Sequence, residues 1–97
     1  MNLHWDARAL QDLRDIRSYI AKRGSAAAAD RVRQHLRTRV HRLVSHPFIG
    51  VLSTNVQIRI LPPTRYPYRI YYTVQGEDVV ILHLRHTARS APDDLGL

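Results

Sequence analysis

The chain has 97 residues, the size of a single domain, and it contains no cysteine. Fifteen basic residues oppose eight acidic ones, which gives a net charge of +7. The lack of cysteine excludes a disulfide framework and thiolate metal sites. No stretch is long and apolar enough to cross a membrane, and the N-terminus lacks a signal-peptide pattern, so we expect a cytoplasmic protein. Its positive surface should attract phosphate groups or an acidic protein.

The N-terminal half predicts a short strand followed by two amphipathic helices. Residues 1–5 form the strand, and Asp6 is a suitable N-cap for a helix over residues 6–23. Ser25 caps a second helix over residues 25–45. Both segments repeat apolar residues at spacings of three and four. Because the linker is very short, the helices should lie antiparallel as a hairpin.

The C-terminal half predicts a small sheet. Residues 56–86 contain three segments rich in aromatic and β-branched residues, separated by turn signals. Residues 87–97 then form a loose tail or a short turn of helix. Two helices followed by strands indicate an α+β fold, in which the hairpin packs on one face of a mainly antiparallel sheet. The other face of the sheet should be open.

Side chains alternate across a strand, so the two faces of the sheet can be assigned by parity. The apolar face should contain Val56, Ile58, Ile60, Ile70, Tyr72, Val80, Leu82 and Leu84. The outer face should contain Arg59, Arg69, Tyr71, His83 and Arg85, with Arg65, Tyr66 and Arg89 at its rim. Arginines and a tyrosine without acids suit phosphate binding and base stacking. The alternative is an ordinary solvated face.

The six histidines are scattered and form no metal-binding pattern, so we expect neither a metal nor a cofactor. His86 shares parity with the core positions and lies at a strand end, which favours a structural, hydrogen-bonded role. Trp5 should be a packing residue beside the sheet.

The order and spacing of many short motifs resemble the ParE/RelE superfamily, the toxins of bacterial type II toxin–antitoxin modules. The resemblance covers nearly the whole chain and implies the same hairpin-on-sheet fold. It rests on Trp5-Asp6, Ala9-Leu10, Asp12-Leu13, Tyr19-Ile20, Ala28-Ala29, Arg31, Leu43, Pro47, Gly50, the run from Tyr68 to Tyr72, Val80-Ile81-Leu82, His86 and Arg89.

The resemblance implies a cognate antitoxin and one of two targets. RelE-like members cut mRNA in the ribosome, whereas ParE-like members poison DNA gyrase. In RelE-like ribonucleases, arginines matching Arg69 and Arg89 act on the phosphate, and Arg59 is the nearest substitute for the basic residues earlier in the sheet. Leu95 stands where those ribonucleases carry a tyrosine, and an apolar side chain can neither transfer a proton nor stack on a base.

We therefore expect a growth-inhibiting, plasmid-stabilising toxin that poisons gyrase through protein contacts, without enzymatic activity. Its antitoxin should be acidic or amphipathic, should fold as it binds, and should wrap the hairpin and the sheet edge. The first alternative is a ribosome-dependent endoribonuclease, in which Arg59, Arg69 and Arg89 stabilise the phosphate and His83 or His86 transfers protons. The second is a non-toxic binding member of the fold.

Overall fold

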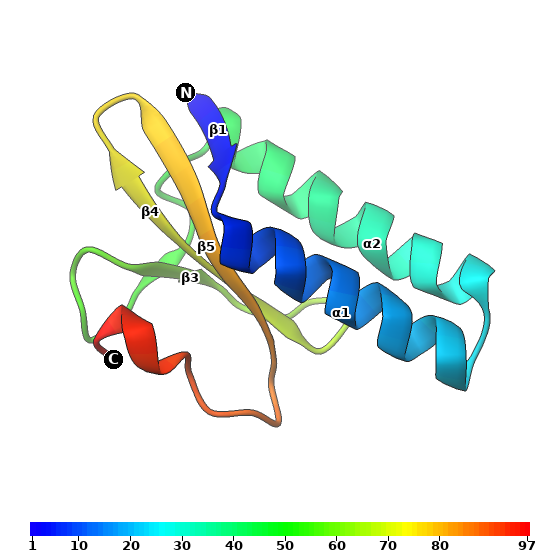
Figure 1. The fold of residues 1–97 in the computed structure, drawn as a ribbon. Helices are drawn as coiled ribbons and strands as arrows, with labels where there is room; N and C mark the ends of the chain where they lie inside the picture. Colours follow the sequence, from blue (N-terminus) through cyan, green and yellow to red (C-terminus); the bar gives the residue numbers. More distant parts are fainter.

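The computed structural model describes all 97 residues (Figure 1). A helical hairpin lies against one sheet, and the chain ends in a short turn beside that sheet. The helices and strands are β1 (Asn2–Trp5), α1 (Ala7–Arg23), α2 (Ala26–His41), β2 (Val51–Leu52), β3 (Arg59–Leu61), β4 (Tyr68–Gln75) and β5 (Asp78–His86). Two 3-10 turns, η1 (Arg42–Val44) and η2 (Asp93–Leu95), complete the fold. No helix has the length and apolar character needed to cross a membrane.

The sheet has five strands in the order β1-β5-β4-β3-β2. The sequence predicted only three, over residues 56–86. The N-terminal strand joins the sheet by pairing parallel to β5, and all other neighbours are antiparallel. The two-residue β2 pairs with β3 and is too short to show any alternation of side chains. The α+β class and the hairpin packed on one face are confirmed.

Both helices begin where the sequence predicted a cap. The Asp6 carboxylate accepts a hydrogen bond from the Arg8 backbone N–H at 2.9 Å, and Ser25 Oγ accepts one from the Ala28 N–H at 3.0 Å. These bonds satisfy backbone donors that have no partner within the helix. The second helix is shorter than predicted, because after His41 the chain tightens into η1 instead of continuing to residue 45.

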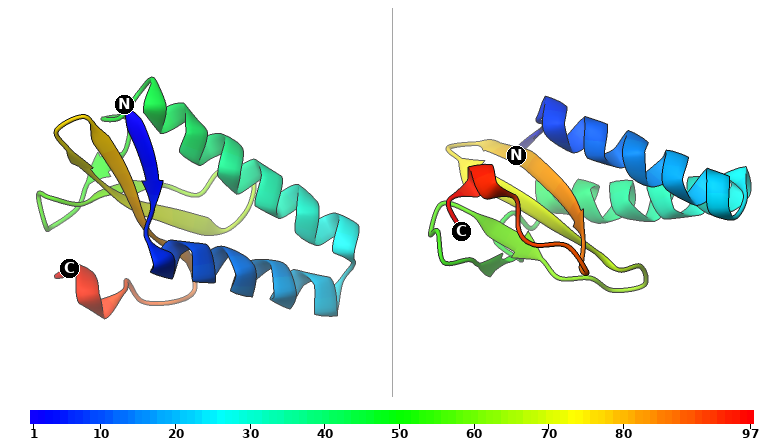
Figure 2. Two further views of the ribbon diagram at one scale, coloured as in Figure 1. Left: turned by 45° about the horizontal axis from the view of Figure 1, so that its top comes forward. Right: turned by 60° about the horizontal axis from the view of Figure 1, so that its bottom comes forward.

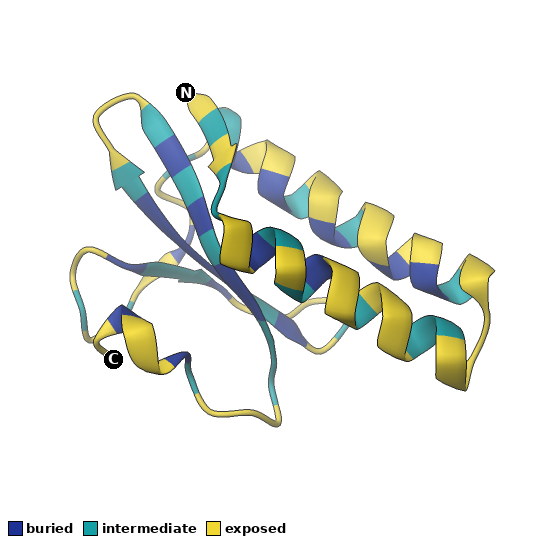
Figure 3. Ribbon diagram, in the orientation of Figure 1, coloured by how far each residue is buried: buried dark blue, intermediate teal, exposed yellow.

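A β-bulge in β5 changes the face assignment that parity predicted. The partner of Tyr71 is His83 but the partner of Tyr72 is Ile81, so Leu82 has no partner on β4. The extra residue switches the side-chain alternation along β5. The main core therefore contains Val79, Ile81, Ile70, Tyr72 and Leu84 beneath the helices (Figure 3). Val80 and Leu82, predicted to face the helices, do not belong to this core.

The first predicted strand is also inverted. Residues that pair across two strands share a face, and here Arg59 pairs with Tyr72 while Ile60 pairs with Tyr71. Arg59 thus lies on the helix side, and Ile60 and Ile58 lie on the opposite side. Val56 is 73% exposed rather than buried. The reason is that β3 starts only at Arg59, after a turn in which the Ile58 N–H donates to the Asn55 carbonyl oxygen.

The C-terminal tail covers part of the sheet face that lies away from the hairpin. After β5 the chain loops out and returns to place η2 against the sheet (Figure 2). There Leu95, which is 6% exposed, packs with Ile58 and Tyr71 in a second small core. The Asn55 side-chain amide donates to the Leu95 carbonyl oxygen at 2.9 Å and holds the turn in place. The predicted open face is therefore only partly open.

Candidate functional site

Two arginines stand side by side on the tail side of the sheet. Arg69 on β4 and Arg85 on β5 are direct cross-strand partners, and both are half-buried. Neither takes part in an ion pair. Arg69 Nη1 donates a hydrogen bond to the Thr87 carbonyl oxygen at 3.4 Å, and the buried Arg85 Nε has no hydrogen-bond partner. Like charges in this position repel, so the pair is suited to bind an anion.

Tyr71 and His83 lie on the same face as this arginine pair, as parity predicted, but they are not exposed. Tyr71 is 3% exposed beneath Leu95, and His83 is 8% exposed. The two residues are cross-strand partners one step along from the arginines. Because η2 covers them, neither can stack on a base or reach a phosphate while the tail is in place.

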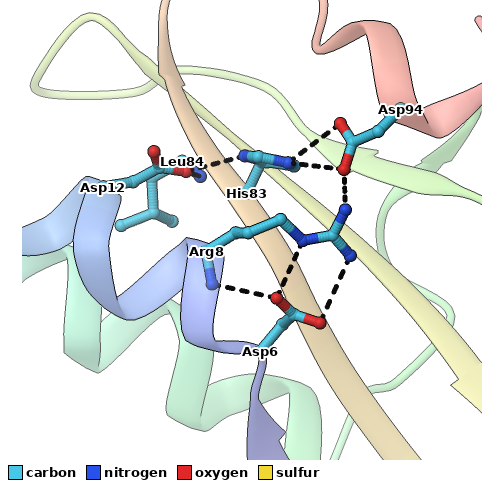
Figure 4. Close-up of polar contacts among 6 residues, drawn as sticks. All are labelled: Asp6, Arg8, Asp12, His83, Leu84 and Asp94. Atoms are coloured by element: carbon cyan, nitrogen blue, oxygen red, sulfur yellow. Dashed lines mark hydrogen bonds and ion pairs between the residues drawn. The ribbon is translucent and has the colours of Figure 1, made fainter.

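His83 is held between two carboxylates (Figure 4). Its Nδ1 lies 2.9 Å from Asp12 Oδ2 on α1, and its Nε2 lies 3.1 Å and 3.2 Å from the Asp94 oxygens on η2. Carboxylate oxygens accept hydrogen bonds, so the imidazole ring is the donor in this network. His83 thereby joins the first helix, the sheet and the tail.

The same network extends on both sides of His83. Asp12 Oδ2 also accepts a hydrogen bond from the Leu84 backbone N–H at 3.0 Å. The pairing of β1 with β5 ends at Ile81, so Asp12 supplies a partner for a backbone donor of β5 beyond that point. Asp94 forms an ion pair with Arg8, whose guanidinium also binds Asp6. The hydrogen bonds from Arg8 lower the pKa of Asp6. These contacts hold the fold together. The spacing of Arg8, Asp12 and Asp94 along the chain forms no motif from which the contacts could be predicted.

Arg59 and Arg65 lie apart from the arginine pair. Arg59 Nη1 donates to the carbonyl oxygens of Phe48 and Gly50 at 3.1 Å and 2.8 Å, and its guanidinium lies 5.2 Å from the centre of the Phe48 ring. It therefore holds the chain that leads into β2. Arg65 is exposed on the connection before β4, with its guanidinium 5.6 Å from the centre of the Tyr66 ring.

His86 and Arg89 meet on the helix side of the sheet. They line a cavity of about 480 Å³ between α1 and the ends of β4 and β5, together with Asp12, Asp15, Ile16, Tyr19, Tyr68, Leu84 and Ala88. His86 packs edge-to-face on Tyr68, and its Nδ1 accepts the Ala88 N–H at 3.0 Å. Burial raises the pKa of Tyr68. His86 thus faces the helix side of the sheet, opposite to Arg69, and Arg89 lines the same cavity from the loop that follows β5.

The predicted site therefore divides into three places: the Arg69–Arg85 pair, the cavity with His86 and Arg89, and the isolated Arg59. No group of three or more histidines, aspartates or glutamates is arranged to hold a metal ion. The largest assembly of proton-transfer and cationic groups within hydrogen-bond distance is the network around His83, whose members already pair with one another.

A solved structure shares this architecture of a helical hairpin on a five-stranded sheet. The structure described as a chromosomal ParDE toxin–antitoxin system from P. aeruginosa matches with a TM-score of 0.81 and 25% identity, over 89% of this chain and 95% of that one.

The sequence family described as the ParE toxin of the type II toxin–antitoxin system parDE matches residues 3–91, and the chain belongs to this family. Toxin RelE2 of Caulobacter vibrioides is 38% identical over 87 residues, which cover 88% of this chain and 93% of that protein. The chain is thus a type II toxin of the ParE/RelE group, and this membership implies an antitoxin partner.

Proposed function

We propose that the chain inhibits growth by binding DNA gyrase rather than by cleaving RNA. The observation that carries this proposal is the separation of the residues that a ribonuclease would need. Arg69 lies on the tail side of the sheet, whereas His86 and Arg89 line the cavity on the helix side. Catalysis at a phosphate requires charge-stabilising and proton-transferring groups about 3 Å from the same reacting atoms.

The remaining candidates for a nuclease site are engaged elsewhere. His83 is enclosed by Asp12 and Asp94, and Arg59 holds the carbonyl groups of the 48–50 connection. Leu95 occupies the sheet face near Tyr71. A poison that acts by contact needs no such convergence, because it needs only a complementary surface.

We assign the contact with the target to the basic patch on the tail side of the sheet, with Arg69 and Arg85 at its centre and Arg65 as an outlying contact. Two neighbouring arginines without acidic partners favour binding to an acidic surface or to a phosphate group of a gyrase–DNA complex. Each charge-assisted hydrogen bond of this kind contributes about 1.5–3 kcal/mol, or roughly a tenfold to hundredfold change in affinity.

Two assays in parallel test the proposal. We expect the purified chain to stall gyrase supercoiling with trapped DNA breaks, and to leave mRNA intact in a ribosomal translation reaction. Arg69→Ser with Arg85→Ser should weaken the gyrase effect at least tenfold. Arg31→Ser with Arg33→Ser removes the same charge from exposed positions of α2 and serves as the control. Ribosome-dependent cleavage of mRNA that Arg69→Ser abolishes would refute the proposal.

We further propose that the antitoxin neutralises the chain by wrapping the hairpin and the open edge of the sheet. The support is an exposed apolar segment around the short edge strand β2, which includes Phe48, Ile49, Val51, Leu52 and Val56. An extended apolar segment could pair with this edge. Co-production with the neighbouring gene product should restore growth and protect the backbone amides of β2 from hydrogen exchange. Unchanged exchange at β2 would place the antitoxin elsewhere.

A further inference from the structure

A second cleft lies on the helix side of the molecule, between β1 and the C-terminal half of α2. It has a volume of about 340 Å³ and is lined by Leu3, Trp5, Gln34, Arg37, Thr38, His41 and Arg42. None of these residues belongs to the surface assigned above to gyrase or to the β2 edge, although those on α2 lie on the hairpin that the antitoxin is proposed to wrap. The cleft combines one aromatic ring with two arginines and a histidine, and no acidic residue lines it.

Trp5 is positioned to offer one side of its indole to this cleft. On β1, Asn2 and His4 are exposed, whereas Leu3 and Trp5 are half-buried and point toward the helices. Trp5 packs against the edge of the main core and also lines the cleft. Its indole is thereby held in place by the core, and a rigid aromatic surface of this kind stacks well on a nucleic-acid base.

The cations beside Trp5 have no partners within the chain. The only acid on α2 is Asp30, and it is paired with Arg17 of α1 at 3.0 Å. No ion pair includes Arg37 or Arg42. Burial lowers the pKa of the neighbouring Arg39, and the charge of Arg42 lowers it further.

Helix stability accounts for only part of this arrangement. Cations at a helix C-terminus offset the negative end of the helix dipole, which explains His41 and Arg42. Arg37 lies a full turn earlier, where the dipole effect has faded, and it is exposed. Gln34 and Thr38 add neutral hydrogen-bonding groups to the same wall of the cleft, and such groups can reach base edges or sugar oxygens.

From these contacts we infer that the β1–α2 cleft binds single-stranded nucleic acid, with Trp5 stacking on one base and Arg37 and Arg42 contacting the adjacent phosphates. A cleft of this size admits one unstacked nucleotide, which a single strand presents at no cost of base pairing. The inference goes beyond gyrase binding and does not depend on it, because no lining residue belongs to the Arg69–Arg85 surface.

Trp5 is the only tryptophan of the chain, so its fluorescence reports directly on this cleft. We expect hexathymidylate to quench that fluorescence in a saturable titration. The affinity should fall as salt rises, with a slope on logarithmic axes of about −0.7 for each phosphate contacted, or about −1.4 in total. Arg37→Ser should weaken binding about tenfold and reduce the slope by about 0.7.

Arg33→Ser is the matched control, because Arg33 is exposed one turn earlier on the same helix and does not line the cleft. It should change the affinity less than about twofold, as a loss of long-range attraction alone. Equal losses in both variants would mean unspecific attraction to a basic helix and would overturn the inference. Absence of quenching would overturn it as well. Hexaglutamate that quenches as strongly as hexathymidylate would reassign the cleft to an acidic protein.

Discussion

Replacing Asp12 with alanine should destabilise the fold more than any other substitution of an acidic residue. Asp12 Oδ2 accepts two hydrogen bonds, one from the Leu84 backbone N–H and one from His83 Nδ1. A buried donor left without a partner costs about 1–3 kcal/mol, and a hydrogen bond to a charged group such as a carboxylate contributes about 1.5–3 kcal/mol. Because the Asp12 side chain is 25% exposed, water can replace part of the lost hydrogen bonding. We therefore expect the free energy of unfolding to fall by about 3 kcal/mol.

For a domain of this size, a loss of about 3 kcal/mol lowers the Tm by roughly 12–24 °C. Urea unfolding followed by circular dichroism measures the change in free energy directly. Asp15→Ala is the control, because Asp15 is exposed one turn further along α1 and only accepts a hydrogen bond from Gln11 at 2.8 Å. Its loss should stay below about 0.5 kcal/mol.

A double-mutant cycle then separates the two bonds of Asp12. In a His83→Ala background, only the bond to Leu84 remains, so Asp12→Ala should cost about 1–2 kcal/mol less than in the natural chain. If Asp12→Ala and Asp15→Ala destabilise the chain equally, the network does not join α1 to β5, and the account of His83 as a structural residue is wrong.

Three further substitutions test other parts of the fold. Leu95→Ala should lower the free energy of unfolding by about 2–3 kcal/mol and expose the tail to proteolysis, because Leu95 fills the second core. Gly50→Ala should cost about 1–3 kcal/mol in urea unfolding, because its Cβ would lie 2.5 Å from the Tyr72 hydroxyl oxygen. The hydrogen bonds from Arg8 lower the pKa of Asp6 from 3.8, so Asp6 contributes stability above that pH and loses it as the pH falls further. The difference in unfolding free energy between the natural chain and Asp6→Ala should therefore narrow below pH 3.8.

Each of these three has a matched control. Leu97 is 42% exposed, so Leu97→Ala should be nearly neutral and should leave the tail protected. An added Cβ at Gly24 would meet only the Ile20 carbonyl oxygen at 3.4 Å, so Gly24→Ala should be tolerated. Asp93 is exposed and forms no ion pair, so Asp93→Ala should change the free energy of unfolding by less than about 0.5 kcal/mol. Equal effects in a test and its control would contradict the packing or charge argument for that site.

The sequence predicts the helical layer of this fold well, because its signals are local. The caps Asp6 and Ser25 lie next to the helices that they begin, and the apolar stripes repeat at the helical period. Ile70 and Tyr72 on β4 face the helices as parity predicted. In each case the pattern that specifies the structure lies within a few residues of the structure itself.

The prediction of the outer face is less successful, because its determinants are distant. The bulge at Leu82 depends on pairing with β4, and no local residue pattern marks it. By the parity of the predicted strand, Arg59 should face solvent, but its guanidinium is held by carbonyl groups eleven and nine residues earlier, in the connection to β2. The tail covers Tyr71 and His83 through Leu95 and Asp94, and no local pattern in residues 87–97 predicts these contacts.

The pairing of β1 with β5 has a consequence for synthesis of the chain. His4 and Asp78 are 74 residues apart in sequence and are joined by a hydrogen bond of 3.1 Å. During synthesis β1 leaves the ribosome first, but its partner β5 is the last strand to be made. The same strand β5 is also the partner of β4. Contacts of such long range form late and slowly. A nascent chain that lacks β5 has no complete sheet, so the surface proposed to bind gyrase forms only after β5 has been synthesised.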